Sequence, residues 1–169
     1  GVLLLAACFG LVGQAVRRWF PRTTSAAYLL AVAAVVLGGQ LYYLLVRPYI
    51  YEYAILCGAA LLMLGLWLWL SAANTPVEKR RALLVRLAFG SLFVALVAGC
   101  RPQIELFAFL AVPIFWQRYI GQKRLRSRAG VGEAAAFILP VVVVAAGLMW
   151  YNAARFGSPF DFGANYNLT

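Results

Sequence analysis

The chain has 169 residues, of which 64% are hydrophobic and 12% are charged, and its mean hydropathy is +0.84. A soluble domain usually contains about 45–50% apolar and about 25% charged residues. A compact fold still exposes much of its surface, so this apolar excess cannot be hidden in one small core. The composition therefore excludes a soluble globular domain and indicates a membrane protein.

The charge is strongly unbalanced. Fifteen Lys and Arg residues stand against five Asp and Glu residues, and the formal net charge is +10. In a soluble protein such an excess would favour nucleic-acid binding. Here the positive residues lie in short clusters between apolar stretches, as in cytoplasmic loops, so we expect no nucleic-acid partner. The cysteines have no disulfide or metal-ligand spacing and are interpreted as packing residues; they are Cys8, Cys57 and Cys100.

Six apolar stretches follow one another, each near the ~20 residues that a helix needs to cross the hydrocarbon of a bilayer. They cover residues 2–16, 26–46, 53–73, 82–100, 103–117 and 134–151, and a polar tail covers 152–169. The fold class that this pattern predicts is all-α, a polytopic transmembrane helical bundle of about six spans. Because the chain begins at Gly1 inside an apolar run, without Met, we expect a single membrane-embedded fragment truncated at both ends.

Positive residues concentrate in every second segment between the spans. Twelve of the fifteen lie there, namely Arg17, Arg18, Arg22, Lys79, Arg80, Arg81, Arg86, Arg118, Lys123, Arg124, Arg126 and Arg128. The other segments hold one each, Arg47, Arg101 and Arg155. The positive-inside rule places the Lys/Arg-rich loops in the cytoplasm and the other three on the outer face. The basic loops would then contact anionic membrane lipids.

The outer segments are the candidate site. Each pairs one Arg with one carboxylate, and these pairs are Arg47 with Glu52, Arg101 with Glu105, and Arg155 with Asp161. One interpretation is structural, with Arg side chains reaching the headgroups and Glu105 complementing the positive end of a helix that Pro102 opens. The other is functional, with the guanidinium groups converging on an anionic ligand such as phosphate, which Arg binds with two hydrogen bonds.

Two of these acids stand at the outer mouths of apolar spans. Desolvation there would suit Glu52 or Glu105 to proton transfer or to cation binding. An ordinary ion pair with Arg47 or Arg101 is the alternative, and the sequence leaves both open. No cofactor is evident, although a divalent cation would be compatible with these carboxylates.

Three patches resemble one known family. The run Tyr-Asn-x-x-Arg-Phe-Gly-Ser-Pro-Phe-Asp-Phe-Gly, from Tyr151 to Gly163, is similar to a segment of bacterial multi-spanning glycosyltransferases that use polyprenyl-phosphate sugars. These are the C-type-fold enzymes, including family 39 and the protein-mannosyltransferase-like members. The stretches 47–58 and 98–102 look similar to segments of the same proteins, and the three patches occur in the same order.

The resemblance implies an enzyme of the bacterial cytoplasmic membrane that transfers a sugar from a lipid-linked donor to an acceptor on the outer face. It implies that an outward-facing carboxylate activates the acceptor, and that this base lies upstream of Gly1. It also implies that Arg47, Glu52, Arg101 and Arg155 line the outer cavity, where Arg neutralises the phosphate leaving group.

Two other classes of function stay open. A transporter or flippase would place its substrate near the midplane, between broken helices. Gly38, Gly39, Pro113 and Pro140 are compatible with such breaks, but ionisable residues within the spans are nearly absent. A non-catalytic membrane assembly subunit is the third alternative.

Overall fold

A computed structural model describes residues 2–38, 46, 50–121 and 127–161. In these ranges the regular secondary structure is entirely helical, which confirms the all-α prediction. The elements are α1 (Val2–Trp19), α2 (Ser25–Gly38), α4 (Ile50–Ala73), α5 (Arg80–Cys100), the 3-10 helix η1 (Pro102–Ala111), α6 (Val112–Phe115), the π-helix η2 (Trp116–Gly121) and α7 (Arg128–Phe156).

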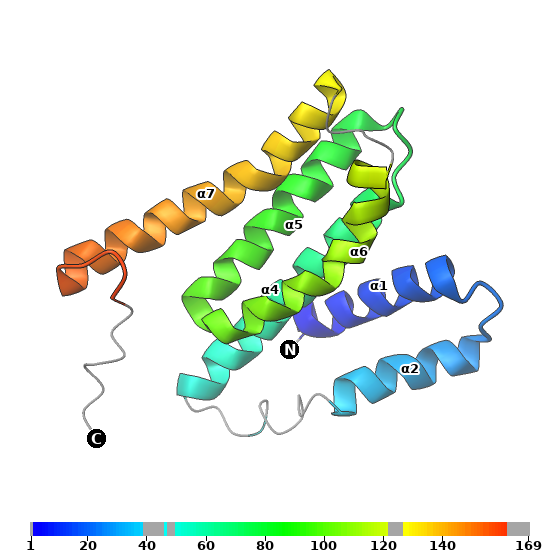
Figure 1. Ribbon diagram of the computed structural model, residues 1–169. Helices are drawn as coiled ribbons and strands as arrows, with labels where there is room; N and C mark the ends of the chain where they lie inside the picture. Colours follow the sequence, from blue (N-terminus) through cyan, green and yellow to red (C-terminus); the bar gives the residue numbers. More distant parts are fainter. Residues whose placement is uncertain (1, 39–45, 47–49, 122–126, 162–169) are drawn as a thin grey trace.

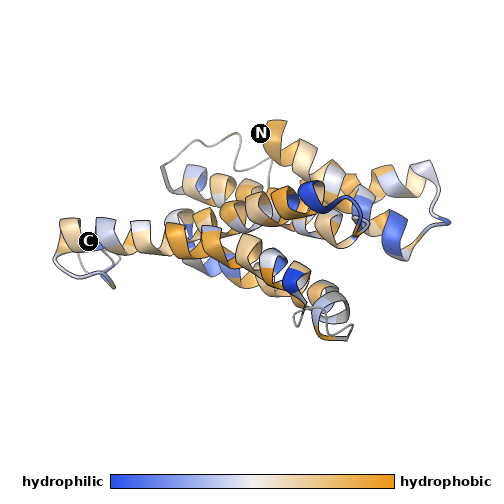
Figure 2. Cartoon of the chain, turned by 90° about the horizontal axis from the view of Figure 1, so that it is seen from above, coloured by the Kyte–Doolittle hydropathy of each residue, from blue (hydrophilic) through white to orange (hydrophobic). Residues whose placement is uncertain are grey.

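Among the described residues, four helices are long and apolar enough to cross a membrane, judged by length and composition. They are Val2–Trp19, Glu52–Ala73 within α4, Arg80–Cys100 and Arg128–Phe156. Helix α2 is apolar too but has 14 described residues. Large hydrophobic side chains are widely exposed on the helix surfaces, which suits a bundle whose solvent is lipid. Figure 2 shows hydrophobic residues mainly along the helix bodies and the most hydrophilic ones near ends and turns.

The helix bounds follow the predicted stretches, with differences at the ends. The sixth predicted span, 134–151, is the middle of a longer helix, α7. Ser127 caps its start, because the Ser127 hydroxyl accepts a hydrogen bond from Gly130 N at 3.0 Å. Gly157 ends it in the left-handed conformation, with φ 75°. Of the second predicted span, 26–46, residues 39–45 lie outside the described residues.

Helices α4 and α5 form the centre of the bundle (Figure 1). Helix α1 packs against α4 and α2 packs against α1, while α7 packs against α5 on the other side. The segment from Pro102 to Gly121 runs back along α4 and α5. Two glycines allow the central pair to approach closely: an added Cβ at Gly65 would lie 2.5 Å from Val94 Cγ2 and 2.9 Å from the carbonyl oxygen of Gly90. Small residues at such points let helix backbones pack together in lipid.

The basic ends of three helices gather at one end of the bundle. At the end of α1, Arg18 Nη1 donates a hydrogen bond to Asn74 Oδ1, just beyond α4. The Asn74 amide in turn donates to Gln14 Oε1 at 3.1 Å. At the start of α5, the Arg80 guanidinium lies against Gly132 of α7. The clusters that the sequence predicts to share one side of the membrane are therefore close together in space.

Replacing Gly65 with Ala tests the close contact of the central pair. We expect Gly65→Ala to reduce the free energy of unfolding by about 1–3 kcal/mol, the usual cost of overpacking. The measurement is the thermal midpoint of the detergent-solubilised protein. Gly147→Ala in α7 is the matched control, because an added Cβ there meets nothing within 4 Å. Equal midpoints for Gly65→Ala and Gly147→Ala would contradict the close approach.

Reporter fusions test the orientation of the bundle. We expect a fluorescent protein fused after Thr23 or after Pro76 to fold and fluoresce in the cytoplasm, because both sites lie at the basic end. Alkaline phosphatase fused after Ser158 should be active, because that site follows the opposite end of α7. Activity of the phosphatase fused after Pro76 but not after Ser158 would show that the orientation is the opposite of the predicted one.

Candidate functional site

The segment Pro102–Gly121 is irregular along its whole length. The sequence predicts one span at 103–117, and the structure has instead ten residues of 3-10 helix, four of α-helix and six of π-helix. Arg101 opens the segment in extended conformation (φ −155°, ψ 99°), and Pro102 occupies its first turn. The ten 3-10 residues rise by about 20 Å, against about 15 Å for an α-helix of equal length. A short segment therefore covers much of the bundle.

Pro113 interrupts the α-helical hydrogen bonding of this segment at Phe109. Proline has no N–H, so Pro113 cannot donate to the carbonyl of Phe109 as an α-helix would require. The Val112 N–H donates to the Phe109 carbonyl instead, which is a 3-10 hydrogen bond. An α-helical turn begins only at Val112, where Pro113 falls in the first turn and its missing N–H costs nothing.

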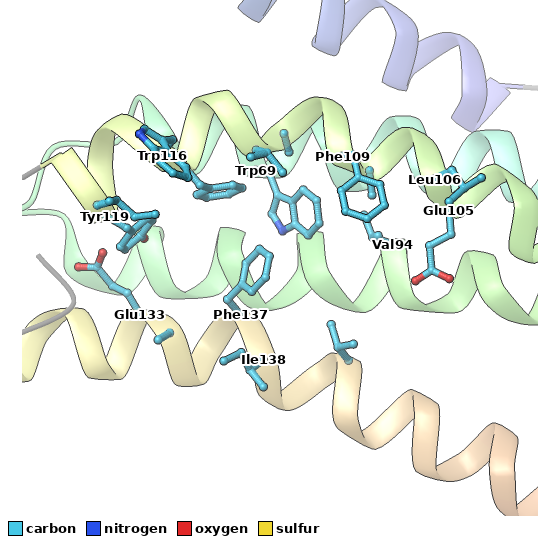
Figure 3. A pocket seen from close by; sticks show the side chains of 17 residues that line it. Trp69, Val94, Glu105, Leu106, Phe109, Trp116, Tyr119, Glu133, Phe137 and Ile138 are labelled. Atoms are coloured by element: carbon cyan, nitrogen blue, oxygen red, sulfur yellow. The ribbon is translucent and has the colours of Figure 1, made fainter. Parts of the chain in front are cut away.

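An apolar groove of about 670 Å³ lies between this segment and α7. Its floor includes Trp69 of α4 and Val94 of α5, as Figure 3 shows. Two exposed side chains at its rim, Leu106 (65%) and Phe109 (70%), indicate that the groove opens sideways from the bundle. The lining residues are Trp69, Val94, Glu105, Leu106, Ala108, Phe109, Ala111, Val112, Phe115, Trp116, Tyr119, Ile120, Glu133, Ala134, Phe137, Ile138 and Val141.

Aromatic rings join the groove's two walls to its floor. The Trp69 ring stacks on Phe137 of α7 with centroids 5.0 Å apart and meets Phe115 edge-on at 5.6 Å. Phe115 also meets Phe137 at 5.4 Å. The Trp69 indole N–H donates to the Ser91 hydroxyl at 3.1 Å, so the buried ring has its polar partner in α5. This cluster fixes the α6 part of the wall to the bundle.

Two carboxylates mark the two ends of the groove. Glu105 is half-buried in the first turn of η1. Glu133 lies at the opposite end, beside Tyr119 in Figure 3, and its side chain is only 1% exposed. The groove therefore suits an apolar chain, and its lining includes one carboxylate at each end.

The structure brings together only part of the predicted site. Arg101 and Glu105 both lie at the start of η1; Glu105 lines the groove, and Arg101, four residues earlier, is not among the lining residues. Glu52 lies in the first turn of α4, and its Oε2 atom is buried without a hydrogen-bond partner among the described residues. Arg47 lies outside the described residues.

The remaining two candidates lie at the far end of α7. The Arg155 guanidinium donates to the Tyr151 hydroxyl at 2.8 Å and lies over the Phe156 ring, 5.0 Å from its centroid. These partners belong to its own helix. Asp161 follows the turn after α7, where its backbone N–H donates to the Ser158 carbonyl at 3.3 Å. Neither residue lines the groove.

Sequence reasoning did not single out Glu133. Its signal is a single carboxylate immediately after the most basic stretch of the chain and just before a long apolar run. Such an acid is expensive to place in a membrane helix and is usually functional or paired. Trp69 lies within the predicted span 53–73, and its place in the groove follows from tertiary packing. Within the described ranges, no group of three or more His, Cys, Asp or Glu residues could hold a metal ion.

Comparison with known proteins found no relative. No family model matches the chain, and neither the curated proteins nor the solved structures contain a match.

Filling the groove tests whether it accepts a hydrocarbon chain. We expect Ile138→Trp to reduce crosslinking of a photoactivatable polyprenyl or fatty chain to residues 102–121 by about tenfold. The larger side chain would exclude about two methylene groups of the bound chain from the groove, each worth about 0.8 kcal/mol. Leu139→Trp is the matched control: Leu139 is 63% exposed against 54% for Ile138, but does not line the groove. Equal crosslinking in both variants would show that chains bind elsewhere.

Proposed function

We propose that the chain is part of an integral-membrane glycosyltransferase that transfers a sugar from a polyprenyl-phosphate donor to an acceptor on the outer face. The observation that carries the proposal is the sideways-open apolar groove, which has Glu105 at one end and Arg101 four residues before Glu105 in the chain. A lipid-linked donor has a long apolar chain and an anionic phosphate. Both needs would be met by one groove in the membrane with a guanidinium group near its mouth.

Arg101 is the residue proposed to bind the phosphate. Its backbone is held at the junction of α5 and η1, because its N–H donates to the Val97 carbonyl at 2.8 Å and its carbonyl accepts from Ile104 N at 3.0 Å. A fixed backbone limits the region that the guanidinium can reach, and Glu105 of the groove lining lies one turn further along the chain. A guanidinium that stabilises the charge developing on a departing phosphate would accelerate transfer.

Glu105 would lie close to the sugar-phosphate bond in this arrangement. It lines the groove at its outer end, four residues from Arg101. Its proposed task is to hold hydroxyl groups of the donor sugar by accepting their hydrogen bonds. The acceptor would be activated by a carboxylate upstream of Gly1, as the family resemblance implies.

The orientation that this proposal needs follows from the charges. The basic ends of α1, α5 and α7 lie together, and the positive-inside rule puts them in the cytoplasm. The Arg101–Glu105 end would then face outward. A bacterial cytoplasmic membrane is the proposed location, with anionic lipids contacting the basic end.

A transporter is the second candidate, favoured by one observation. Glu133 is a carboxylate 1% exposed within the bundle, and the irregular segment Pro102–Gly121 forms the opposite wall. Buried acids and discontinuous helices are typical of ion-coupled carriers. In the leading proposal Glu133 instead closes the inner end of the groove.

Substituting Arg101 tests the leading proposal in the full-length protein. We expect Arg101→Ala to reduce release of polyprenyl phosphate from a polyprenyl-phosphate sugar by about 10²-fold, the usual cost of one lost transition-state donor. Arg101→Lys should retain part of the rate, since it keeps the charge but loses the two-pronged geometry. The measurement is donor turnover in proteoliposomes.

Arg81→Ala is the matched control, because Arg81 is exposed at the basic end and does not line the groove. Wild-type turnover in a folded Arg101→Ala variant would remove Arg101 from the site. Solute uptake by the wild-type protein without any release of polyprenyl phosphate would instead support the transporter.

A further inference from the structure

The groove-lining residues of the irregular segment repeat every three positions. In η1 they occur as adjacent pairs, with one position skipped between pairs: 105 and 106, 108 and 109, 111 and 112. A 3-10 helix has three residues per turn, so each pair stacks on the next and the wall presents two straight columns. Beyond Pro113 the lining positions are 115 and 116, then 119 and 120, with wider spacing. The present shape of the groove therefore depends on the 3-10 geometry.

The core-facing residues of the same segment repeat differently. Ala111 belongs to the buried cluster around Trp69, and Ile104, Ala108 and Phe115 pack against that cluster. All of them except Ile104 also line the groove, so they face both the core and the groove. Their spacing of four, three and four residues is that of an α-helix. In an α-helix these side chains would lie within about 60° of one another, whereas a 3-10 helix turns Ile104 about 120° away from Ala108. The sequence thus carries the core stripe of an α-helix although the backbone is 3-10.

The 3-10 stretch is unusually long. Runs beyond three or four residues are uncommon, because their hydrogen bonds are poorer and their side chains eclipse. Here the 3-10 helix has ten residues and a π-helix of six follows it after one α-turn. A 3-10 helix has fewer residues per turn than an α-helix and a π-helix has more, so the two departures from α-helical twist partly compensate each other. Both unusual helices occur in the segment that forms the groove wall opposite α7. Pro113 opposes a continuous α-helix through this segment, because it cannot donate to the Phe109 carbonyl.

We propose that Pro102–Ala111 is a moving wall that switches between the observed 3-10 helix, which leaves the groove open, and an α-helix, which fills it. In the α-helical state Glu105, Phe109, Val112 and Trp116 would be spaced four, three and four residues apart. They would form a single ridge toward α7. Leu106 would rotate away, and the two columns that frame the groove would be lost.

A hydrocarbon chain in the groove selects the open state. A ligand shifts such an equilibrium only through contacts that differ between the two states. Those contacts exist here, because Leu106 and Ala111 line the groove only in the two-column arrangement. The α-helical state instead gains better backbone hydrogen bonds and its aligned core stripe. The identity of the chain as that of a polyprenyl-phosphate donor rests on the proposed function, but the switch itself does not.

The test measures the helix type directly with two spin labels, at Gln103 and Leu110, in the full-length protein in nanodiscs. Both side chains are exposed and neither lines the groove. In the 3-10 helix the labelled positions are about 14 Å apart along the axis and point about 120° apart; in an α-helix they are about 10 Å apart and point the same way. Dipolar broadening of the continuous-wave spectrum is therefore stronger in the α-helical state.

Pro113→Ala restores the missing N–H, and we expect it to increase the broadening. Adding polyprenyl phosphate to the wild type should decrease it. Pro140→Ala is the matched control, because it removes a proline from the interior of α7 without touching the wall. Its spectrum should equal that of the wild type.

Each outcome has a defined consequence. Broadening that is the same in wild type and in folded Pro113→Ala would overturn the moving wall. If Pro113→Ala does not fold, a wild-type spectrum unchanged by polyprenyl phosphate or by a long-chain fatty alcohol would overturn it. A spectrum that responds to Pro113→Ala but not to polyprenyl phosphate would support the wall and reject this donor, and with it the proposed function.

Discussion

Lipid cannot form hydrogen bonds with the backbone, and this constraint governs the whole structure. Every N–H and carbonyl group at membrane depth needs a partner within the protein, which leaves the helix as the available form for each stretch. The segment Pro102–Gly121 shows how strongly the constraint acts. Pro113 removes one donor, and the chain responds by changing helix type rather than by leaving the Phe109 carbonyl unpaired. The groove that carries the proposed function is a result of this local solution.

The sequence predicted the bundle well because the signals for it are local. Apolar length and the alternation of basic clusters are properties of neighbouring residues, and the long helices α1, α4, α5 and α7 each contain one of the predicted spans or most of it. The helix caps at Ser127 and Gly157 extend α7 beyond its apolar part, so hydropathy alone placed the ends too far inward. The change to 3-10 helix was not predicted, although Pro113 was visible, because many membrane helices tolerate a proline with only a kink.

The candidate site was predicted less completely, because it is made by tertiary contacts. Arg101 and Glu105 are close in sequence, and their common place at the start of η1 follows directly from that, although only Glu105 lines the groove. Arg155 was grouped with them only because it lies on the same predicted face, and its observed partners are Tyr151 and Phe156 of its own helix. Trp69 and Glu133 come from helices far apart in the chain, and no spacing rule connects them. Their common role in the groove required the packing of α4 against α7 through the Phe137 ring.

The length of helix α7 makes the groove sensitive to the thickness of the membrane. Its 29 residues extend for about 43 Å, whereas the hydrocarbon layer of a bilayer is about 30 Å thick. A helix that is too long for the layer usually tilts, and the tilt increases as the layer becomes thinner. Because α7 is one wall of the groove and α5 supports its floor, a change of tilt would alter the width between them. The acyl-chain length of the host membrane thereby sets the width of the groove and the size of the ligand that it can bind.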